Sequence, residues 1–404
     1  MDGEKGGEGG LMMENLKIAI VGAGETSLLA AATFGTVYPV IVFDPDRSKR
    51  ARFDEKGIAF TDQASELADA GILLITGSKR PVYTLDGLSE LCRIVGSHMK
   101  KGSVLIFEAP VYPGTTEETC IPLLEQHSGL AAGKEFFVGF VPARWQGGEA
   151  QGKVAKMRKV IAGQSGPVTD YLADLFAPVH DGGIYKAKSI RVAEAAQLLE
   201  IAQKEVNIAL MNEVALTLNQ QGIDTHDVLE TANTRRGFIK LEPDLLGDHA
   251  VPWHGMDQFW CKGEQKGRQV AQRVIKKLIQ NEVIIHEARI TVLGVTREDG
   301  TSEAPEAGVI ELVSELQEYG MDVQVADARL EMWQAECAGG VLLTKQEELL
   351  PAVSVILAVP HEAYRKAGWK LYERLLDGKS GYVFDVKSIL ERNEKPEKVT
   401  LWRM

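Results

Sequence analysis

A glycine-containing turn near the amino end of the chain has the spacing of a dinucleotide-binding loop. The turn Gly22-x-Gly24-x-x-Ser27 follows an apolar run at residues 16–21, and Asp44 follows a second run at residues 40–43. Two glycines permit a tight turn and close approach of the backbone to a pyrophosphate, which the amino end of the next helix then faces. The predicted cofactor-binding residues are Gly22, Ala23, Gly24, Glu25, Thr26, Asp44 and Glu108.

Asp44 indicates which dinucleotide this turn would bind. An acidic residue after the second strand suits the free ribose hydroxyls of NAD and repels the additional phosphate of NADP. Arg47 and Lys49 lie close by and leave NADP open, while Glu25 places a negative charge near the pyrophosphate. The pattern predicts NAD as the cofactor; the alternative is a Rossmann-like domain that has lost its cofactor.

Two histidines, His249 and His254, lie close together in a segment rich in aromatic residues. Histidine titrates near neutral pH, so either side chain could act as a general base in the oxidation of an alcohol. The alternative is that one is a hydrogen-bonded structural histidine and the other is exposed. His249 and His254 are therefore the candidate catalytic residues.

Alternating apolar runs and helical patterns indicate the elements that would position these groups. Strands are expected at residues 16–21, 40–43, 71–76, 104–107, 290–293, 323–325, 354–358 and 382–386, and helices at 28–34 and 308–319. Apolar residues at three- and four-residue spacing predict one long helix at residues 189–221, with Gly222 as its end. The predicted fold class is α/β: two Rossmann-like, doubly wound parallel-sheet domains joined by a central helical domain with one long helix.

Composition narrows the class of protein further. A net charge of −12 argues against non-specific nucleic-acid binding, and no apolar run is long enough to span a bilayer. The polar first ten residues lack the features of a signal peptide. The four cysteines are scattered without CxxC spacing, which argues against a zinc site and fits a reducing cytoplasm. We expect a cytoplasmic protein that binds neither nucleic acid nor membrane.

Several segments along the chain resemble the UDP-glucose/GDP-mannose dehydrogenase family. They are residues 111–118 (VYPGTTEE), 193–196 (AEAA), 206–213 (VNIALMNE), 222–226 (GIDTH), 384–387 (FDVK) and 402–404 (WRM). The similarity is greatest to the UDP-N-acetylmannosamine and UDP-N-acetylgalactosamine dehydrogenases. It implies an NAD domain at residues 12–188, a helical dimerisation domain at 189–288 and a nucleotide-sugar domain at 289–404. Residues 1–11 are expected to form a disordered tail because they are polar and rich in glycine and glutamate. It also implies a homodimer formed through the central helix.

The residues that perform the family's chemistry differ in this chain. Family members form a thioester on a cysteine during a four-electron alcohol-to-acid oxidation; Ala250 occupies that position. A lysine and an asparagine of the family correspond to Gln197 and Ile201, a catalytic aspartate to His254, and a glutamate to Ala143. The water-holding Glu-Ser-Thr stretch corresponds to residues 108–110, and a lysine and an arginine of the last domain to Glu298 and Pro305. Catalytic groups of this kind act as a unit, so the loss of one leaves little reason to retain the others.

The resemblance also implies where a substrate would bind. Residues that border the family's substrate pocket correspond to Arg144, Lys204, Arg235, Arg236 and Gly247. Adjacent arginines could hold a phosphate or carboxylate, although Arg235 and Arg236 fit a solvated surface pair equally well.

Three functions are consistent with the sequence. The first is an NAD-dependent enzyme that oxidises or epimerises a CH–OH group of a sugar or nucleotide sugar in two-electron steps, without a thioester. The second is a catalytically inactive relative that binds a ligand or partners an active dehydrogenase. The third, an ordinary UDP-sugar 6-dehydrogenase, requires another thiol in place of Ala250. The first is favoured because the cofactor turn is mostly retained.

Overall fold

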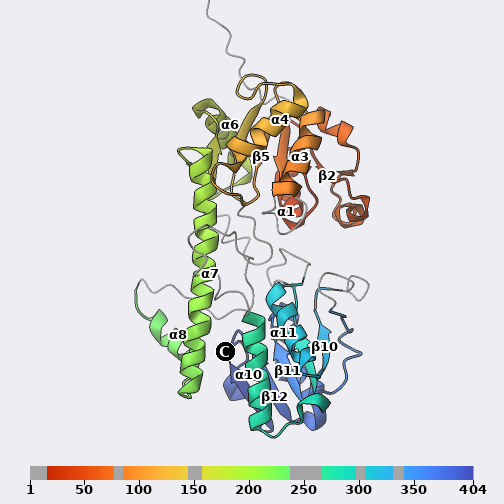
Figure 1. Ribbon diagram of the computed structural model, residues 1–404, viewed down its shortest axis with the longest axis vertical. Helices are drawn as coiled ribbons and strands as arrows, with labels where there is room; N and C mark the ends of the chain where they lie inside the picture. Colours follow the sequence, from red (N-terminus) through yellow and green to blue (C-terminus); the bar gives the residue numbers. More distant parts are fainter. Residues whose placement is uncertain are drawn as a thin grey trace, which may run out of the picture. The chain divides into compact units, whose positions relative to one another are not determined.

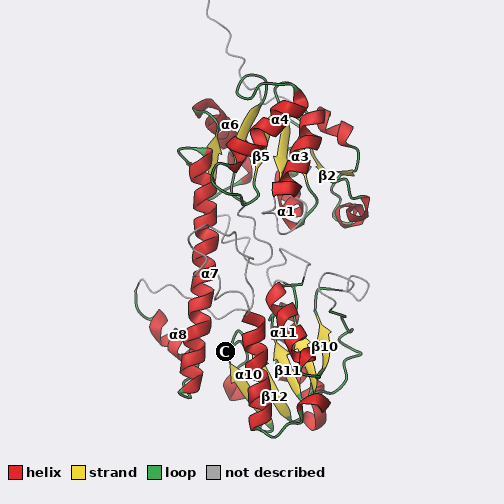
Figure 2. Cartoon of the chain, in the orientation of Figure 1, coloured by secondary structure: helices red, strands yellow, loops and turns green. Residues whose placement is uncertain are grey.

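The structure, a computed structural model, describes residues 16–76, 85–143, 157–236, 266–296, 305–330 and 341–403. These residues form two compact units, Met1–Glu200 and Ile201–Met404, and the long helix α7 (Ile190–Gln220) has residues in both. Each unit contains its own sheet, covered by helices on both faces (Figure 1, Figure 2). The α/β fold with doubly wound sheets and one long helix is confirmed. The boundaries of a separate central domain stay a prediction.

The first unit contains an eight-stranded sheet of order β3-β2-β1-β4-β5-β6-β7-β8. All its strand pairs are parallel except β6 with β7, which are antiparallel. Its strands are β1 (Ile18–Val21), β2 (Val40–Phe43), β3 (Phe60–Thr61), β4 (Ile72–Ile75), β5 (Val104–Phe107), β6 (Phe137–Phe140), β7 (Lys159–Gly163) and β8 (Ile184–Lys186). Strand order reverses between β1 and β4, which is where open parallel sheets bind ligands.

Both faces of this sheet are buried. Alternate residues of each strand enter opposite cores, so Ala19 packs with one cluster and Ile18 with the other. One core contains residues of α1 (Glu25–Phe34) and α6 (Gly166–Phe176); the other contains residues of α3 (Leu85–His98) and α4 (Ile121–Ser128). Burial on both sides explains why these strands are continuous apolar runs rather than alternating patterns.

The second unit repeats this architecture on a smaller scale. Its five-stranded parallel sheet has the order β10-β9-β11-β12-β13. The strands are β9 (Arg289–Leu293), β10 (Asp322–Ala326), β11 (Ser354–Leu357), β12 (Gly381–Asp385) and β13 (Val399–Arg403). The helices are α8 (Thr225–Asn233), α10 (Lys266–Gln280), α11 (Ala307–Glu318), α12 (Glu362–Ala367) and α13 (Trp369–Leu375), with part of α7. No helix among the described residues is long and apolar enough to cross a membrane.

The carboxyl group of Asp385, the last residue of β12, is completely buried in the second unit. Its Oδ2 accepts a hydrogen bond of 2.7 Å from the N–H of Leu390, and burial raises the pKa of Asp385 to about 6. An unfolded aspartate ionises near pH 4. Folding is therefore most favoured, as far as this group is concerned, below about pH 4, and that contribution is lost as the pH rises through about 6.

We predict that Asp385→Asn removes this pH dependence. Relative to the variant, the wild-type protein should lose about 2–3 kcal/mol of unfolding free energy between pH 4 and pH 7. Unfolding of the full chain, followed at several pH values, measures the difference. Exposed Asp377 provides the control substitution Asp377→Asn. Parallel stability curves for wild type and Asp385→Asn would contradict the prediction.

Candidate functional site

The glycine turn after β1 has the backbone conformation that a dinucleotide-binding loop requires. Gly22 has a φ of +100°, a region that side-chain-bearing residues rarely adopt. Its N–H donates to the carbonyl of Phe43, which ties the turn to β2, and α1 begins at Glu25. The helix starts three residues earlier than the predicted start at Leu28, so the N–H groups of its first turn directly follow the glycines. The turn and helix end fit a pyrophosphate.

Ser27, in place of the usual third glycine, connects the turn to the sheet. Its side chain is fully buried; its Oγ accepts from the N–H of Gly24 at 3.1 Å and donates to the carbonyl of Gly22. The same hydroxyl lies 2.8 Å from Oγ1 of Thr76, the residue after β4. The substitution thus adds hydrogen bonds that stabilise the turn.

Asp44 also stabilises the turn. Its side chain is almost fully buried, and Oδ2 accepts from the N–H of Ala23 at 2.8 Å and from Nζ of Lys49 at 2.7 Å. Its Oδ1 accepts from the N–H of Asp46 at 2.9 Å. In this arrangement the carboxylate holds the loop against β2, and Lys49 balances its charge. A ribose contact for Asp44 stays a prediction.

Two positions that the family resemblance marks as altered, Ala143 and Gln197, meet at the backbone of Glu108, at the carboxyl end of β5. The N–H of Ala143 and Nε2 of Gln197 both lie 3.3 Å from the backbone carbonyl oxygen of Glu108, to which they donate. Gln197, on α7, is only 4% exposed, and its Oε1 has no hydrogen-bond partner among the described residues. Residues far apart in the sequence therefore form one edge, at which Gln197 places an amide.

Lys159, at the start of β7, joins this edge and was not predicted. Its Nζ lies 3.6 Å from Oε1 of Glu108, and both side chains are almost completely buried. The strand could be read from the apolar residues that follow, but a lysine at its start is usually solvated. Only the antiparallel addition of β7 beside β6 brings Lys159 to the same edge as Glu108.

Glu194 anchors the first turns of α7 against the segment after β5. Its buried carboxylate accepts the N–H of Gly114 at 2.5 Å and that of Thr116 at 3.0 Å. The π-helical turn Thr116–Cys120 begins at the second of these donors. Glu194 lies three residues before Gln197, on the same side of the helix, so its contacts also fix the position of Gln197. The AEAA segment marked the resemblance, but Glu194 itself had no predicted role.

The remaining predicted site residues are not brought together within the described parts of the chain. Lys204 lies exposed on α7, and Arg235 and Arg236 lie exposed just after α8. The side chain of Glu25 and the residues Arg144, Gly247, His249, Ala250 and His254 lie outside what the structure describes. The catalytic and substrate-binding roles stay predictions.

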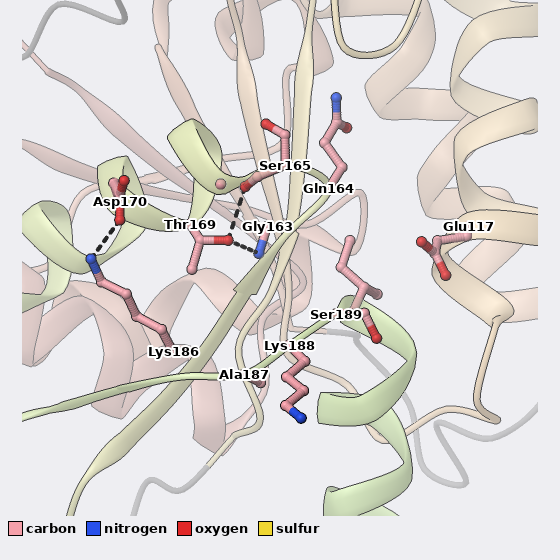
Figure 3. Close-up of a pocket in the computed structure, with 12 residues that line it drawn as sticks. Glu117, Gly163, Gln164, Ser165, Thr169, Asp170, Lys186, Ala187, Lys188 and Ser189 are labelled. Carbon is pink, nitrogen blue, oxygen red and sulfur yellow. Dashed lines mark hydrogen bonds and ion pairs between the residues drawn. The ribbon is translucent and has the colours of Figure 1, made fainter.

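A polar hollow of about 300 Å³ in the first unit lies away from this edge. It is lined by the end of β7, the start of α6 and the segment after β8, and Figure 3 shows Lys186 paired with Asp170 and Thr169 bonded to Gly163 and Ser165. Because β7 is antiparallel to β6, the end of β7 lies toward the amino end of β6. The hollow is therefore at the opposite edge of the sheet from the glycine turn.

The fold and the glycine turn define a Rossmann-type protein, and comparison with known proteins gives the family. Two models of the UDP-glucose/GDP-mannose dehydrogenase family match, the central domain at residues 191–277 and the UDP binding domain at residues 291–392. Protein CapL of Staphylococcus aureus is 32% identical, covering 96% of this chain and 100% of its own length. The chain therefore belongs to the UDP-glucose/GDP-mannose dehydrogenase family.

Other relatives support the same assignment. A UDP-N-acetyl-D-glucosamine 6-dehydrogenase of Pseudomonas aeruginosa is 28% identical over 95% of this chain and 99% of its own length. Among solved structures, the UDP-D-ManNAc dehydrogenase of Pyrococcus horikoshii is similar in fold, with a TM-score of 0.76 and 20% identity over 96% of this chain and 99% of that one. The predicted resemblance is confirmed.

We predict that Glu194→Gln destabilises the first unit. The amide retains one acceptor but turns an NH2 group toward a backbone N–H, and the charge-assisted bonds are lost, which should cost about 2–3 kcal/mol of unfolding free energy. Chemical unfolding of the full chain measures the loss. Exposed Glu55 supplies the control substitution Glu55→Gln, for which no comparable change is expected. Equal stability of the two variants would show that Glu194 is not an anchor.

Proposed function

We propose that this protein is an NAD-dependent oxidoreductase that acts on a CH–OH group of a sugar or nucleotide sugar in two-electron steps, without a thioester intermediate. Family membership and relatives named as UDP-sugar dehydrogenases support the substrate class. The turn at Gly22, the start of α1 and Asp44 support a dinucleotide cofactor. Epimerisation by oxidation and reduction of the same carbon belongs to the same proposal.

The convergence of Gln197 and Ala143 on the carbonyl of Glu108 is the observation that carries this proposal. These positions hold an amide and a methyl group where the family resemblance implies a lysine and a glutamate. An amide does not supply the positive charge with which an ammonium group stabilises a developing oxyanion. We therefore expect this site to catalyse only part of the family's four-electron reaction. The turn that would bind the cofactor is nevertheless formed.

The proposed reaction needs few protein groups. Bound NAD would supply the acceptor for the hydride of the substrate carbon. The residues at Gly22–Gly24 and the start of α1 would hold the pyrophosphate, and His254 would accept the hydroxyl proton, with His249 as the second candidate base. The carbon becomes a carbonyl. With a methyl group at Ala250, no covalent capture follows. The carbonyl compound is then either released as the product or reduced again to the epimer.

Basic residues would hold the anionic part of the substrate. Arg144, Lys204, Arg235 and Arg236 are assigned this role, with Gly247 allowing close approach of the substrate to the backbone. The exposure of Lys204, Arg235 and Arg236 is compatible with binding a diphosphate from solvent.

We predict that turnover of UDP-N-acetylhexosamines releases at most about one NADH per substrate molecule, because no thiol captures the carbonyl product for a second oxidation. Net oxidation releases one NADH, and epimerisation releases none. His254→Ala should lower kcat at least about 100-fold by removing the base. Ala250→Cys should leave the stoichiometry unchanged, because Gln197 and Ile201 remain. NADH absorbance with analysis of the sugar product measures all three.

The exposed His286 provides the control substitution His286→Ala, which should leave kcat unchanged. A uronic acid with two NADH per substrate would contradict the proposal and indicate the full family reaction. NAD binding without turnover of any sugar in a broad panel would identify an inactive relative. If calorimetry detected no NAD binding, both the proposed cofactor and the proposed enzymatic activity would be contradicted.

We also propose that the chain forms a homodimer through α7. Val192, Leu199 and Leu210 are 50%, 58% and 52% exposed, which is unusual for apolar side chains. They lie seven and eleven residues apart, close to whole numbers of helical turns, so they share one face of the helix. A stripe of large apolar side chains on a long helix suits packing against a second copy.

We predict that Leu199→Glu raises the dissociation constant of the dimer at least roughly tenfold, because association would desolvate a carboxylate. Sedimentation across a dilution series measures the change. Leu342, which is 77% exposed and lies outside α7, gives the control Leu342→Glu. A wild-type monomer at all concentrations, or equal effects of the two substitutions, would contradict the predicted interface.

A further inference from the structure

A buried ion pair lies at the carboxyl end of the sheet in the first unit. Glu108 follows β5 and is 0% exposed, and Lys159 at the start of β7 is 2% exposed. Lys159 Nζ lies 3.6 Å from Glu108 Oε1 and 5.5 Å from the centre of the Phe176 ring. Two charges removed from water cost free energy, which their mutual attraction offsets only in part. Such a pair is weak evidence for a role in stability.

The location of the pair suggests what its charges act on. The strand order of this sheet reverses between β1 and β4. Asp44 follows β2, on one side of the reversal, and Glu108 follows β5, on the other side. A dinucleotide bound across this reversal places one nucleotide on each side. With the adenosine part beside Asp44, the nicotinamide part would lie on the side of β4, β5 and β6. Charges at the end of β5 therefore face the nicotinamide side.

The two forms of the cofactor differ in charge at that position. The oxidised nicotinamide ring carries one positive charge, and the reduced ring carries none. A buried carboxylate without a counter-ion would favour the oxidised ring, because charges interact strongly where water is excluded. Lys159 cancels most of that preference without touching the ring. The amide of Gln197, which bonds the Glu108 carbonyl, adds no charge of its own.

We propose that Lys159 is a positioning residue that neutralises Glu108, so that the site binds oxidised and reduced NAD with similar affinity and releases the reduced form readily. The inference rests on the proposed cofactor and names a residue for which neither the family resemblance nor the sequence assigned a role. It concerns the electrostatic field at the site rather than the chemical step.

The test is the ratio of the dissociation constants of NAD+ and NADH, measured by calorimetry at pH 8 on the full chain. Lys159→Met should lower Kd(NAD+)/Kd(NADH) about tenfold, and Glu108→Gln should raise it about tenfold, because each single variant leaves one uncompensated unit charge where water is excluded. The double variant should return the ratio to within about twofold of the wild-type value.

A surface pair on the same sheet supplies a matched control. Lys101 lies before β5, 3.2 Å from Glu135, and is 71% exposed. Lys101→Met makes the same chemical change at the amino end of the strand and should leave the ratio unaltered. If Lys159→Met does not fold, Glu108→Gln and the double variant still test the sign.

The outcomes separate the inference from the proposed function. Equal weakening of NAD+ and NADH in the single variants would show a purely structural ion pair and overturn the inference, while leaving an NAD-binding protein. Absence of binding of either form to the wild type would overturn the proposed function itself. Opposite shifts in the two single variants, cancelled in the double variant, would support the inference.

Discussion

The carboxylate of Glu194 is the contact on which the amino-terminal site depends. It is fully buried and accepts the N–H groups of Gly114 and Thr116. A buried charge is tolerated only when hydrogen bonds replace the lost hydration, so the segment after β5 and the first turns of α7 have one favourable arrangement. Gly114, with a φ of +101°, allows the chain to present its N–H there. Gln197, one turn further along the helix, consequently reaches the carbonyl of Glu108.

The two units use the same device to shape the turn after their first strand. In the first, Gly22 has a positive φ and Asp44, after β2, accepts the N–H of Ala23. In the second, Gly294 has a φ of +82°, and Asp327, after β10, accepts the N–H groups of Val295 and Thr296 at 2.7 and 2.8 Å. Burial opposes ionisation of Asp327, but the hydrogen bond and charge of His361 hold its pKa well below the usual value. Each buried acid has a nitrogen-bearing partner, Lys49 at 2.7 Å from Asp44 and His361 at 3.1 Å from Asp327, in addition to its backbone hydrogen bonds.

Periodicity and composition predicted much of the fold. The long helix was expected at residues 189–221 and is Ile190–Gln220; the strand at residues 104–107 was predicted to the residue. Several strands were missed, among them β6 (FVGF), whose apolar run is interrupted by Gly139, and β8, a short strand whose Tyr185 is exposed. A short edge strand such as β8 is stabilised by hydrogen bonding to a sheet already present rather than by its own pattern, so no local signal marks it. The cofactor turn was predictable because its glycines and Asp44 are close in sequence and their spacing follows from backbone geometry.

The sequence by itself determined the fold class, the family resemblance and the position of the glycine turn, because each depends on local residue types and spacing. Only the tertiary structure decided which side chains share the site. Glu108, Ala143, Lys159 and Gln197 come from four separate segments and meet because β7 adds antiparallel to β6 and Glu194 fixes the start of α7. Lys159 and Glu108 are 51 residues apart in the sequence. Their charges interact strongly only after folding brings them close together and excludes water, because the interaction depends on distance and dielectric constant and not on sequence separation.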